Sequence, residues 1–566
     1  MALKKLILTT ALAATLALPV RAEDAGGYLA ARTAIFASDF AEAAQYFSRA
    51  LIRDPGNVSL LENAATAYLG LGDLDRAAPI ARRMIQSGSA SQLAGLVLFG
   101  DAARKGNWDM IGADLEAGLT VGPLFDGLAR SWALVGDGRM SEALEAFDTV
   151  GASQGVEAFG LYHKALALAS VGDFEGAAEI FSGDSGSTIR LTRRGLIAYV
   201  EVLSQLEKND VALELIAATF GSNLDPYLED VKARLEAGEV LPFTTVRTPL
   251  DGIAEVYFSI ASALQGEAQQ AYTLLYSRMA MILRPDHIDA LLMTAELLED
   301  LERFDLATEV YDTVPRDDPA FHAAELGRAE ALRLSGRDDA AIEVLRQLTK
   351  SHGALPLVHV KLGDTLRGLE RFQESIKPYD DALALIETPE EQHWIIYFAR
   401  GISHERVGDW DKAEADFRKA LELRPEQPQV MNYLGYSFLE MQTNYDEALD
   451  LIERAVALRP DSGYIIDSLG WGLYRLGRYE EAVGHMEKAV ELMPIDPVVN
   501  DHLGDVYWAV GRKREAEFQW HRARSFADQA SGDIAPGRVR RKLEVGLDRV
   551  LEEEGAPPLK MVNDSN

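Results

Sequence analysis

Small residues recur in this sequence at intervals of 34 or 35 positions. Glycine stands at Gly401, Gly435, Gly470 and Gly504, and alanine at Ala413, Ala448, Ala482 and Ala516. A glycine inside a helix costs about 1 kcal/mol relative to alanine, so its regular return indicates that a second helix packs closely against it. The sequence therefore predicts a stack of antiparallel helix pairs, one pair for each repeat.

Large apolar residues and prolines keep the same interval. Leu434, Leu469 and Leu503 are each followed four residues later by Phe438, Leu473 or Tyr507, which gives the first helix of each pair one apolar stripe. Pro425, Pro460 and Pro494 end the second helices. The blocks DSLGWGLYRLGRYEEAV and NDHLGDVYWAVGRKREA carry all of these features. In spacing and residue type they resemble the tetratricopeptide repeat (TPR).

The register extends backwards from these blocks through Thr273 and as far as Ala43. It predicts an all-α superhelical solenoid of about fourteen helix pairs. The phase breaks once, within 221–252, where we expect a short helix over 226–236 followed by an extended connector through the run 243–246. The predicted parts are a signal peptide (1–22), an N-terminal TPR array (23–220), a linker with a short helix (221–252), a C-terminal TPR array (253–530), a single capping helix (531–554) and a disordered tail (555–566).

The first residues predict export. Lys4 and Lys5 precede an apolar stretch from Leu6 to Leu18, and Val20 and Ala22 are small residues where a signal peptidase reads. Cleavage after Ala22 would place the chain in the periplasm. The absence of cysteine excludes disulfides and lipid attachment to a cysteine, so a lipoprotein is not expected. The formal net charge of −33 opposes binding to nucleic acid or to an anionic membrane.

Motifs for catalysis, phosphate binding and metal binding cannot be recognised in the sequence. Histidines are scattered, and the pair His404-Glu405 has Gly408 where a zinc-binding second histidine would stand. We therefore expect no enzyme activity, no metal and no cofactor.

The first helices of such a solenoid line a concave groove. If the repeat is numbered so that the mid-helix glycine (for example Gly470) is position 8, then positions 2, 5, 9, 12 and 13 face this groove. In the last three units, these positions predict a protein-binding groove made of Asn432, Tyr436, Tyr464, Asp467, Trp471, Tyr474, Arg475, Asp501, Asp505 and Trp508. The tryptophans and tyrosines would be rigid anchors for a partner. Alternatively, Trp471 and Trp508 pack against the adjoining repeat.

The polar groove residues raise a second question. Asn432, Asp467 and Asp501 share one repeat position, and this ladder would suit backbone amides or basic side chains of a partner better than a carboxylate. Alternatively, its members are ordinary solvated positions. A basic patch follows, which would either dock an acidic partner or balance the acids near Glu544 and at 552–554. It consists of Arg512, Lys513, Arg514, Arg522, Arg524, Arg538, Arg540, Arg541 and Lys542.

The repeats between 254 and 523 also resemble a bacterial family of exported TPR proteins. Some members are outer-membrane lipoproteins that deliver cell-wall hydrolases to a carboxyl-terminal processing protease. The resemblance implies a periplasmic scaffold or adaptor with protein partners of that kind. One alternative is a scaffold for polysaccharide export or outer-membrane assembly. Another is an enzyme with a site in 221–252, which would require a deep pocket with buried titratable residues there.

Overall fold

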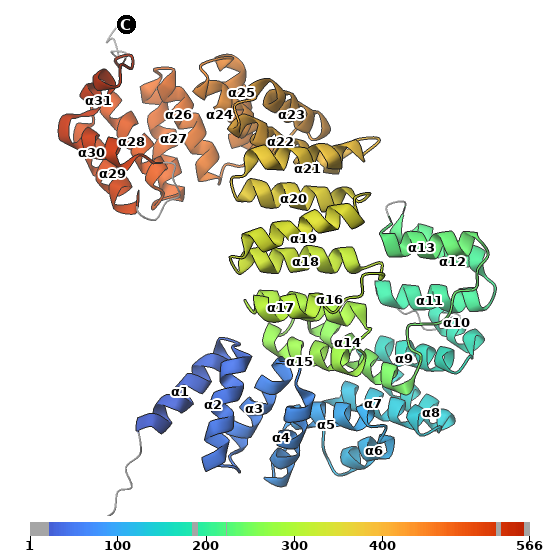
Figure 1. Ribbon diagram of the computed structural model, residues 1–566. Helices are drawn as coiled ribbons and strands as arrows, with labels where there is room; N and C mark the ends of the chain where they lie inside the picture. The colour runs from blue at the N-terminus through green and yellow to red at the C-terminus, as the bar shows by residue number, and fades with distance from the viewer. Residues whose placement is uncertain (1–21, 184–190, 222–223, 528–533, 560–566) are drawn as a thin grey trace, which may run out of the picture. The chain divides into compact units, whose positions relative to one another are not determined.

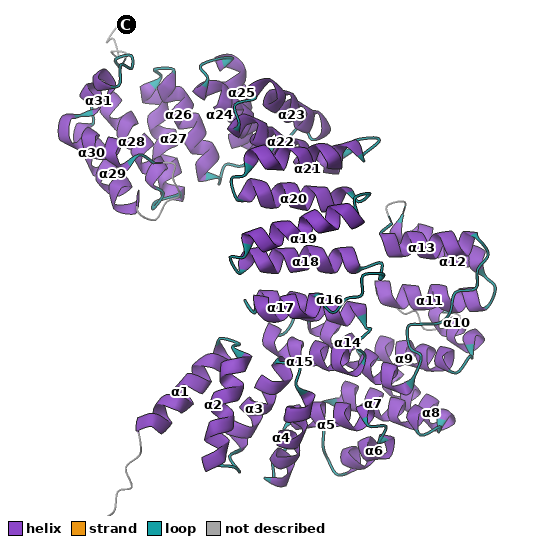
Figure 2. Ribbon diagram, in the orientation of Figure 1, coloured by secondary structure: helices purple, strands orange, loops and turns teal. Residues whose placement is uncertain are grey.

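The computed structural model describes residues 22–183, 191–221, 224–527 and 534–559. Over these ranges the protein is built of helices and connecting loops, and no β-strand occurs within them (Figure 2). The predicted signal peptide lies outside the described residues except for Ala22, where the first helix begins. No helix in the described ranges has the length and apolar character needed to cross a membrane.

The helices pair as antiparallel hairpins, which confirms the predicted all-α solenoid (Figure 1). In the described ranges there are fourteen pairs, with α13 between the sixth and the seventh. The helices up to α13 are α1 (Ala22–Phe36), α2 (Phe40–Arg53), α3 (Val58–Gly70), α4 (Leu74–Gln86), α5 (Gln92–Arg104), α6 (Trp108–Glu116), α7 (Pro123–Gly136), α8 (Met140–Gly151), α9 (Glu157–Ser170), α10 (Phe174–Ser182), α11 (Arg193–Gln205), α12 (Asn209–Phe220) and α13 (Pro226–Glu236).

The remaining helices follow the connector 237–248. They are α14 (Pro249–Leu264), α15 (Gln270–Leu283), α16 (Ile288–Asp300), α17 (Phe304–Tyr311), α18 (Phe321–Leu334), α19 (Asp338–Ser351), α20 (Pro356–Gly368), α21 (Phe372–Ala384), the 3-10 turn η1 (Glu391–His393), α22 (Trp394–Arg406), α23 (Trp410–Leu423), α24 (Pro428–Glu440), α25 (Tyr445–Leu458), α26 (Gly463–Arg475), α27 (Tyr479–Leu492), α28 (Pro497–Ala509), α29 (Lys513–Phe526), α30 (Pro536–Val545) and α31 (Leu547–Glu553).

The recurring glycines allow the second helix of each pair to pack closely against the first, as their spacing predicted. A Cβ atom added to Gly401 would lie 2.6 Å from the ring of Phe417, and one added to Gly504 would lie 2.4 Å from the ring of Trp520. In each case the ring belongs to the second helix of the same pair. Because no side chain intervenes, the two helices approach closely and the large ring fills the space between them. The alanines of the second helices, such as Ala413, are fully buried.

The described chain forms two compact units, the first ending at Leu348 and the second beginning at Thr349. The predicted linker 221–252 therefore lies inside the first unit and does not separate two units. The reason is that the chain folds back after it. Helix α14 packs on α7, and α15 packs on α3, so the start of the predicted C-terminal array shares a core with the N-terminal array.

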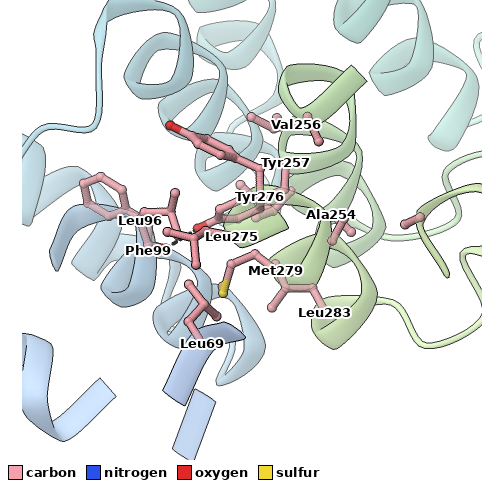
Figure 3. Packing of buried hydrophobic residues seen from close by; sticks show 14 of the residues in the cluster. Leu69, Leu96, Phe99, Ala254, Val256, Tyr257, Leu275, Tyr276, Met279 and Leu283 are labelled. Atoms are coloured by element: carbon pink, nitrogen blue, oxygen red, sulfur yellow. Dashed lines mark hydrogen bonds between the residues drawn. The ribbon is translucent and has the colours of Figure 1, made fainter. Parts of the chain in front are cut away.

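The fold-back buries a continuous apolar core (Figure 3). Tyr257 of α14 lies with its ring 4.9 Å from Phe125 of α7, and both rings are buried. Met279 of α15 fills the space above Gly100 of α5, where an added Cβ would lie 1.9 Å from its methyl carbon. Residues more than 150 positions apart thus share one core, which the local repeat pattern could not predict.

The C-terminal cap differs from the single helix that we predicted over 531–554. It consists of α30 and α31, separated by Gly546, whose φ of 83° is a conformation that favours glycine. A Cβ atom at this position would also lie 2.6 Å from the ring of Trp508. Of the predicted disordered tail, residues 555–559 are described, and Leu559 packs against the core of the second unit. Residues 560–566 lie outside the described ranges.

Candidate protein-binding groove

In the first unit, the groove positions of α11 hold an extended segment of the chain itself. Glu201, at position 9 of its repeat, is 5% exposed. Its carboxylate accepts hydrogen bonds from the backbone N–H groups of Thr244, at 3.0 Å, and Thr245, at 3.1 Å. It also accepts from both threonine hydroxyls. One buried acid therefore binds four donors of a two-residue segment.

The carbonyl groups of the same two threonines are bound by arginines. Arg284 donates to the carbonyl oxygen of Thr244 at 3.0 Å, and Arg194, at position 2, donates to that of Thr245 at 3.2 Å. Further along α11, the Ser204 hydroxyl accepts from the backbone N–H of Leu241 at 2.9 Å. The backbone of this extended segment, 241–245, thus finds side-chain partners that replace water, as a buried chain without a β-sheet requires.

Beside this segment lies a buried cluster of charged and titratable side chains centred on Glu255 of α14. Arg194 donates to its carboxylate at 2.8 Å, and the Tyr162 hydroxyl donates at 2.9 Å. His287 lies 3.3 Å from it. Burial alone would raise the pKa of Glu255, but the charge of Arg194 and the bond to His287 outweigh burial and hold this pKa well below its usual range. The carboxylate is therefore ionised and bound on several sides.

His287 in this cluster is neutral. Burial, followed by the charge of Arg194, lowers its pKa below the ordinary value. Its Nδ1 accepts from the backbone N–H of Ala290 at 3.2 Å, where it caps the start of α16. Nε2 is then the protonated nitrogen, and it donates to Glu255. Both ring nitrogens are engaged, so neither is free to accept a proton from a substrate.

The buried titratable residues that a site near 221–252 would require are therefore present, although the sequence did not reveal them. Clefts of about 290 and 360 Å³ open beside them in the first unit. Each member of the cluster named above is bound to another part of the chain, and together they fasten α14 and the connector to α9 and α11. Sequence reasoning missed the cluster because its members are spread over α9, α11, α14 and the N-cap of α16 and look like ordinary helix-surface charges.

Helices also occupy the groove of the first unit. Trp132, at position 9 of its repeat, is fully buried, and an added Cβ on Gly252 of α14 would lie 2.3 Å from its ring. The Tyr257 hydroxyl donates to the carbonyl of Leu96 at 2.5 Å. Arg278 of α15 donates to the carbonyl of Gly70, at the end of α3, at 3.1 Å. The concave face of this unit is consequently filled from α3 to α11 by the same chain.

In the second unit, the predicted aromatic anchors are packed between repeats. The ring of Trp471 is stacked 4.7 Å from that of Tyr474 on one side and 3.9 Å from that of His502, in the next repeat, on the other. Tyr474 is buried. Both faces of Trp471 are covered, and its N–H donates to Glu440 at 3.3 Å. The interpretation in which Trp471 packs against the adjoining repeat is the one that the structure supports.

The groove face of α28 is covered by the chain's own cap. Lys542 of α30, whose side chain is fully buried, donates to Asp501 at 2.8 Å and to Asp505 at 2.6 Å. Trp508 donates to Asp548 at 3.0 Å and lies against Gly546. These three predicted groove residues are therefore not open to a partner. The basic group that would suit the aspartates comes from the chain itself.

The other predicted groove residues vary in exposure. Asn432 is buried, and Asp467 is buried against His502, whose Nδ1 lies 3.1 Å from the carboxylate. Tyr436 and Arg475 are half-buried, and Arg475 donates to Glu440 at 3.4 Å. Tyr464 alone among the ten is classed as exposed, at 46%. The ladder Asn432, Asp467, Asp501 thus consists of buried or paired side chains rather than solvated ones.

The predicted basic patch is largely neutralised by nearby acids. Arg538 pairs with Glu554 at 2.8 Å, Arg541 with Glu553 at 2.7 Å, and Arg512 with Glu487 at 2.8 Å. Lys513 lies over the ring of Trp508, and Arg522 donates to a backbone carbonyl, that of Pro494. Arg514, Arg524 and Arg540 are exposed. The structure favours the interpretation in which this patch balances local acids.

An open stretch of groove remains over α20, α22, α24 and α26. Leu357, Ile395, Gln429 and Tyr464 each lie six residues before the mid-helix glycine of their helix, at the position that Arg194 holds on α11. Leu357 is 58% exposed and Ile395 is 47% exposed, close to the value for Tyr464. These exposed side chains share one repeat position on the concave side of neighbouring first helices, which makes them a candidate interaction surface. We call these four helices the open stretch.

The structure thus defines a helical-repeat solenoid whose concave positions are filled from α3 to α11 in the first unit and partly open in the second. Comparison with known families identifies the repeat. The family model described as tetratricopeptide repeat matches residues 28–91, 292–356 and 398–463, and two further models with the same description match 355–426 and 465–496. The matched stretches are thus similar to tetratricopeptide repeats, and the fold is an all-α solenoid of the kind that such repeats build.

Two curated relatives match parts of the chain. A TPR repeat-containing protein of Pseudomonas aeruginosa is 29% identical over 169 residues, which cover 28% of this chain and 26% of that protein. A lipoprotein NlpI homolog of Haemophilus influenzae is 38% identical over 90 residues, which cover 16% of this chain and 28% of that protein. The chain spans about a quarter of the length of these relatives.

Solved structures with a similar arrangement of helices include the APC/C hetero-tetramer Cut9-Hcn1, at 13% identity and a TM-score of 0.37, covering 93% of this chain and 96% of that chain. Another is YrrB, described as a TPR protein with an unusual peptide-binding site, at 18% identity and a TM-score of 0.27. This match covers 33% of the present chain and 94% of YrrB.

Proposed function

We propose that this protein is a non-enzymatic adaptor of the bacterial cell envelope that binds partner proteins in the open stretch of its second unit. The observation that carries the proposal is the contrast between occupied and open groove positions. In the first unit these positions bind the connector and α14, which demonstrates that side chains there can hold a polypeptide. In the open stretch, position 2 presents the exposed side chains of Leu357, Ile395 and Tyr464 without such a cover.

The proposed location is the periplasm. It rests on the predicted signal peptide and receives support from the relative named as a lipoprotein NlpI homolog. This chain has no cysteine to carry a lipid, so we propose a freely diffusing form instead of an anchored one. N-terminal sequencing of the mature protein should begin at Glu23. A sequence beginning at Met1 would contradict the proposed export.

The proposed partners are a carboxyl-terminal processing protease and the cell-wall hydrolases that it cleaves. The adaptor would hold both along one long surface, so that several weak contacts give useful avidity. This assignment rests on the family resemblance of the C-terminal repeats. In-cell crosslinking of a tagged mature chain, followed by mass spectrometry, should recover both kinds of protein.

The groove assignment is tested in the same experiment by paired variants. Ile395→Glu combined with Tyr464→Glu places two charges in the open stretch, where burial against a partner would be costly. We expect at least a tenfold loss of the crosslinked partners. Leu458→Glu is the matched control, because Leu458 is 41% exposed but lies on a second helix, α25. Equal recovery with the double variant and the unchanged protein would contradict the assignment.

A further inference from the structure

We propose that the open stretch binds one amphipathic α-helix of its partner, laid across α20, α22, α24 and α26, and not an extended segment. The inference rests on the proposed function, since it names the kind of partner segment that the same groove takes. It follows from what the chain's own segments require when they occupy equivalent positions.

An extended segment requires polar side chains in the groove. On α11, residues 241–245 are held through their backbone N–H and carbonyl groups by Glu201, Ser204 and Arg194. Because an extended chain has no hydrogen bonds of its own, a groove that buries it must supply them. The groove positions of α11 meet this need with one acid, one hydroxyl, one arginine and the amide of Gln205, which donates to the carbonyl of Leu241.

The open stretch offers fewer such groups. Where α11 has Arg194 at position 2, three of the four helices have Leu357, Ile395 or Tyr464, and only α24 has a polar amide, Gln429. The acids that do face the groove already have partners within the unit. Asp364 accepts from the Tyr379 hydroxyl at 2.7 Å, and Glu440 accepts from Trp471 and Arg475.

A helix does not need such groups, because its backbone hydrogen bonds are internal. What it needs is an apolar surface for one face. The open stretch presents such a surface through its exposed position-2 side chains. An amphipathic helix therefore fits its chemistry better than an extended segment does.

The chain supplies a precedent directly next to the open stretch. Helix α30 covers the groove face of α28, with Val539 buried and Lys542 bound between two aspartates. Helix α28 in turn packs on α26, the last helix of the open stretch. The open stretch is thus continuous with a surface that already binds a helix. In the first unit α14 provides a second precedent, with Gly252 against Trp132.

Helix geometry converts this proposal into a measurable spacing. Packed helices lie about 8–10 Å apart, so each step between neighbouring first helices corresponds to about 6 residues of a partner helix at about 1.5 Å per residue. An extended partner would advance by about 3 residues per step, at about 3.3 Å per residue. Leu357 and Ile395 are one step apart, and Ile395 and Tyr464 are two steps apart.

The experiment uses the full chain with the photo-crosslinking residue benzoylphenylalanine placed separately at 357, 395 and 464. Crosslinked partner residues are mapped by mass spectrometry. We expect crosslinks on one partner segment about 6 residues apart between the first two sites and about 12 apart between the last two. The same residue placed at 458 is the control and should not crosslink to that segment.

The outcomes separate this inference from the proposed function. Crosslinks about 3 residues apart for the first pair of sites and about 6 apart for the second would indicate an extended partner segment. That result would contradict the inference of a bound helix but would still support the groove as the partner site. Crosslinks scattered over unrelated partner segments would also overturn it. If none of the three groove sites crosslinks to a partner, or if position 458 crosslinks to the same segment, both the helix and the groove assignment fail.

Discussion

The two units use the same groove positions for different purposes. In the first unit, side chains such as Trp132 and Glu201 are buried against the chain's own connector and α14. In the second unit, the cap covers only the end of the groove, at α28, while Leu357 and Ile395 stay exposed. The same groove positions are therefore buried where the chain returns to cover them and exposed where it does not.

The largest effect should follow from removing the charge at the centre of the filled groove. Glu255→Gln would leave Arg194, with a side chain 16% exposed, without its main counter-charge. Breaking a buried pair by removing one partner costs about 3–5 kcal/mol. Urea unfolding should show this loss. In the open stretch, Glu440→Gln removes an exposed pair with Arg475 and should cost less than about 1 kcal/mol. Equal losses would contradict the contrast between the units.

The units should also differ in their response to pH. Burial lowers the pKa of His163, in the first unit, to about 4, below its ordinary value of 6.5. Its neutral form is stabilised by folding, so this stabilisation is complete above pH 6.5 and is lost as the pH falls toward 4. Between these two pH values, the free energy of unfolding should fall by about 1.4 kcal/mol for each pH unit. The His163 ring packs against Trp132 and Tyr162, and the Trp132 N–H donates to its Nδ1. The negative charge of Glu255 favours the protonated form of His163 but does not outweigh burial.

His502, in the second unit, should show the opposite sign. Burial opposes its protonation, but the charge of Asp467 and its hydrogen bond raise the pKa overall. Its contribution is complete below the unfolded pKa and is lost as the pH rises through the folded pKa. We expect the plot of urea midpoint against pH, from pH 4.5 to 7.5, to differ from that of the unchanged protein. It should be flatter below pH 6.5 for His163→Gln and flatter above pH 6.5 for His502→Gln. An unchanged profile in either variant would refute its assignment.

A smaller loss should result from adding one methyl group at the fold-back. Gly252→Ala would press a Cβ atom onto the Trp132 ring, and overpacking of this kind costs about 1–3 kcal/mol. Gly484→Ala is the matched control in the second unit, because nothing lies within 4 Å of its added Cβ on α27. There the better helix propensity of alanine should stabilise the protein by up to about 1 kcal/mol. Thermal unfolding should therefore shift in opposite directions.

The smallest change in overall unfolding should follow from Lys542→Met. This variant removes the buried ammonium between Asp501 and Asp505 and leaves only Arg538, 3.6 Å from Asp505, as a nearby cation, so α30 should detach. The cost to the rest of the chain cannot exceed the free energy with which two short terminal helices dock. We expect hydrogen exchange to lose protection over 536–553, while 241–245 in the first unit remains protected. Retained protection over 536–553 would contradict the role of Lys542.

Much of the fold could be predicted because its determinants are local. Gly401 and Ala413 lie within one repeat, as do Gly504 and Ala516, so a short stretch of sequence is enough to predict how each helix pair packs. That the groove of the last three units binds a partner stays a prediction; at the equivalent positions of α11, Arg194 and Glu201 bind the chain's own connector. Their occupants could not be predicted. Trp471, Asp505 and Trp508 were expected in a groove, yet His502, Lys542 and Gly546 cover them from other repeats or from the cap.

By itself, the sequence determined the class of fold and the approximate number of helix pairs, because each depends on residues less than about 40 positions apart. Only the tertiary structure decided which part of the groove is free. Arg278 binds the carbonyl of Gly70, and Tyr257 that of Leu96, across 208 and 161 residues. Contacts of that range depend on how the helices of the first unit stack and on a connector that lets the chain return, and neither leaves a periodic signal in the sequence.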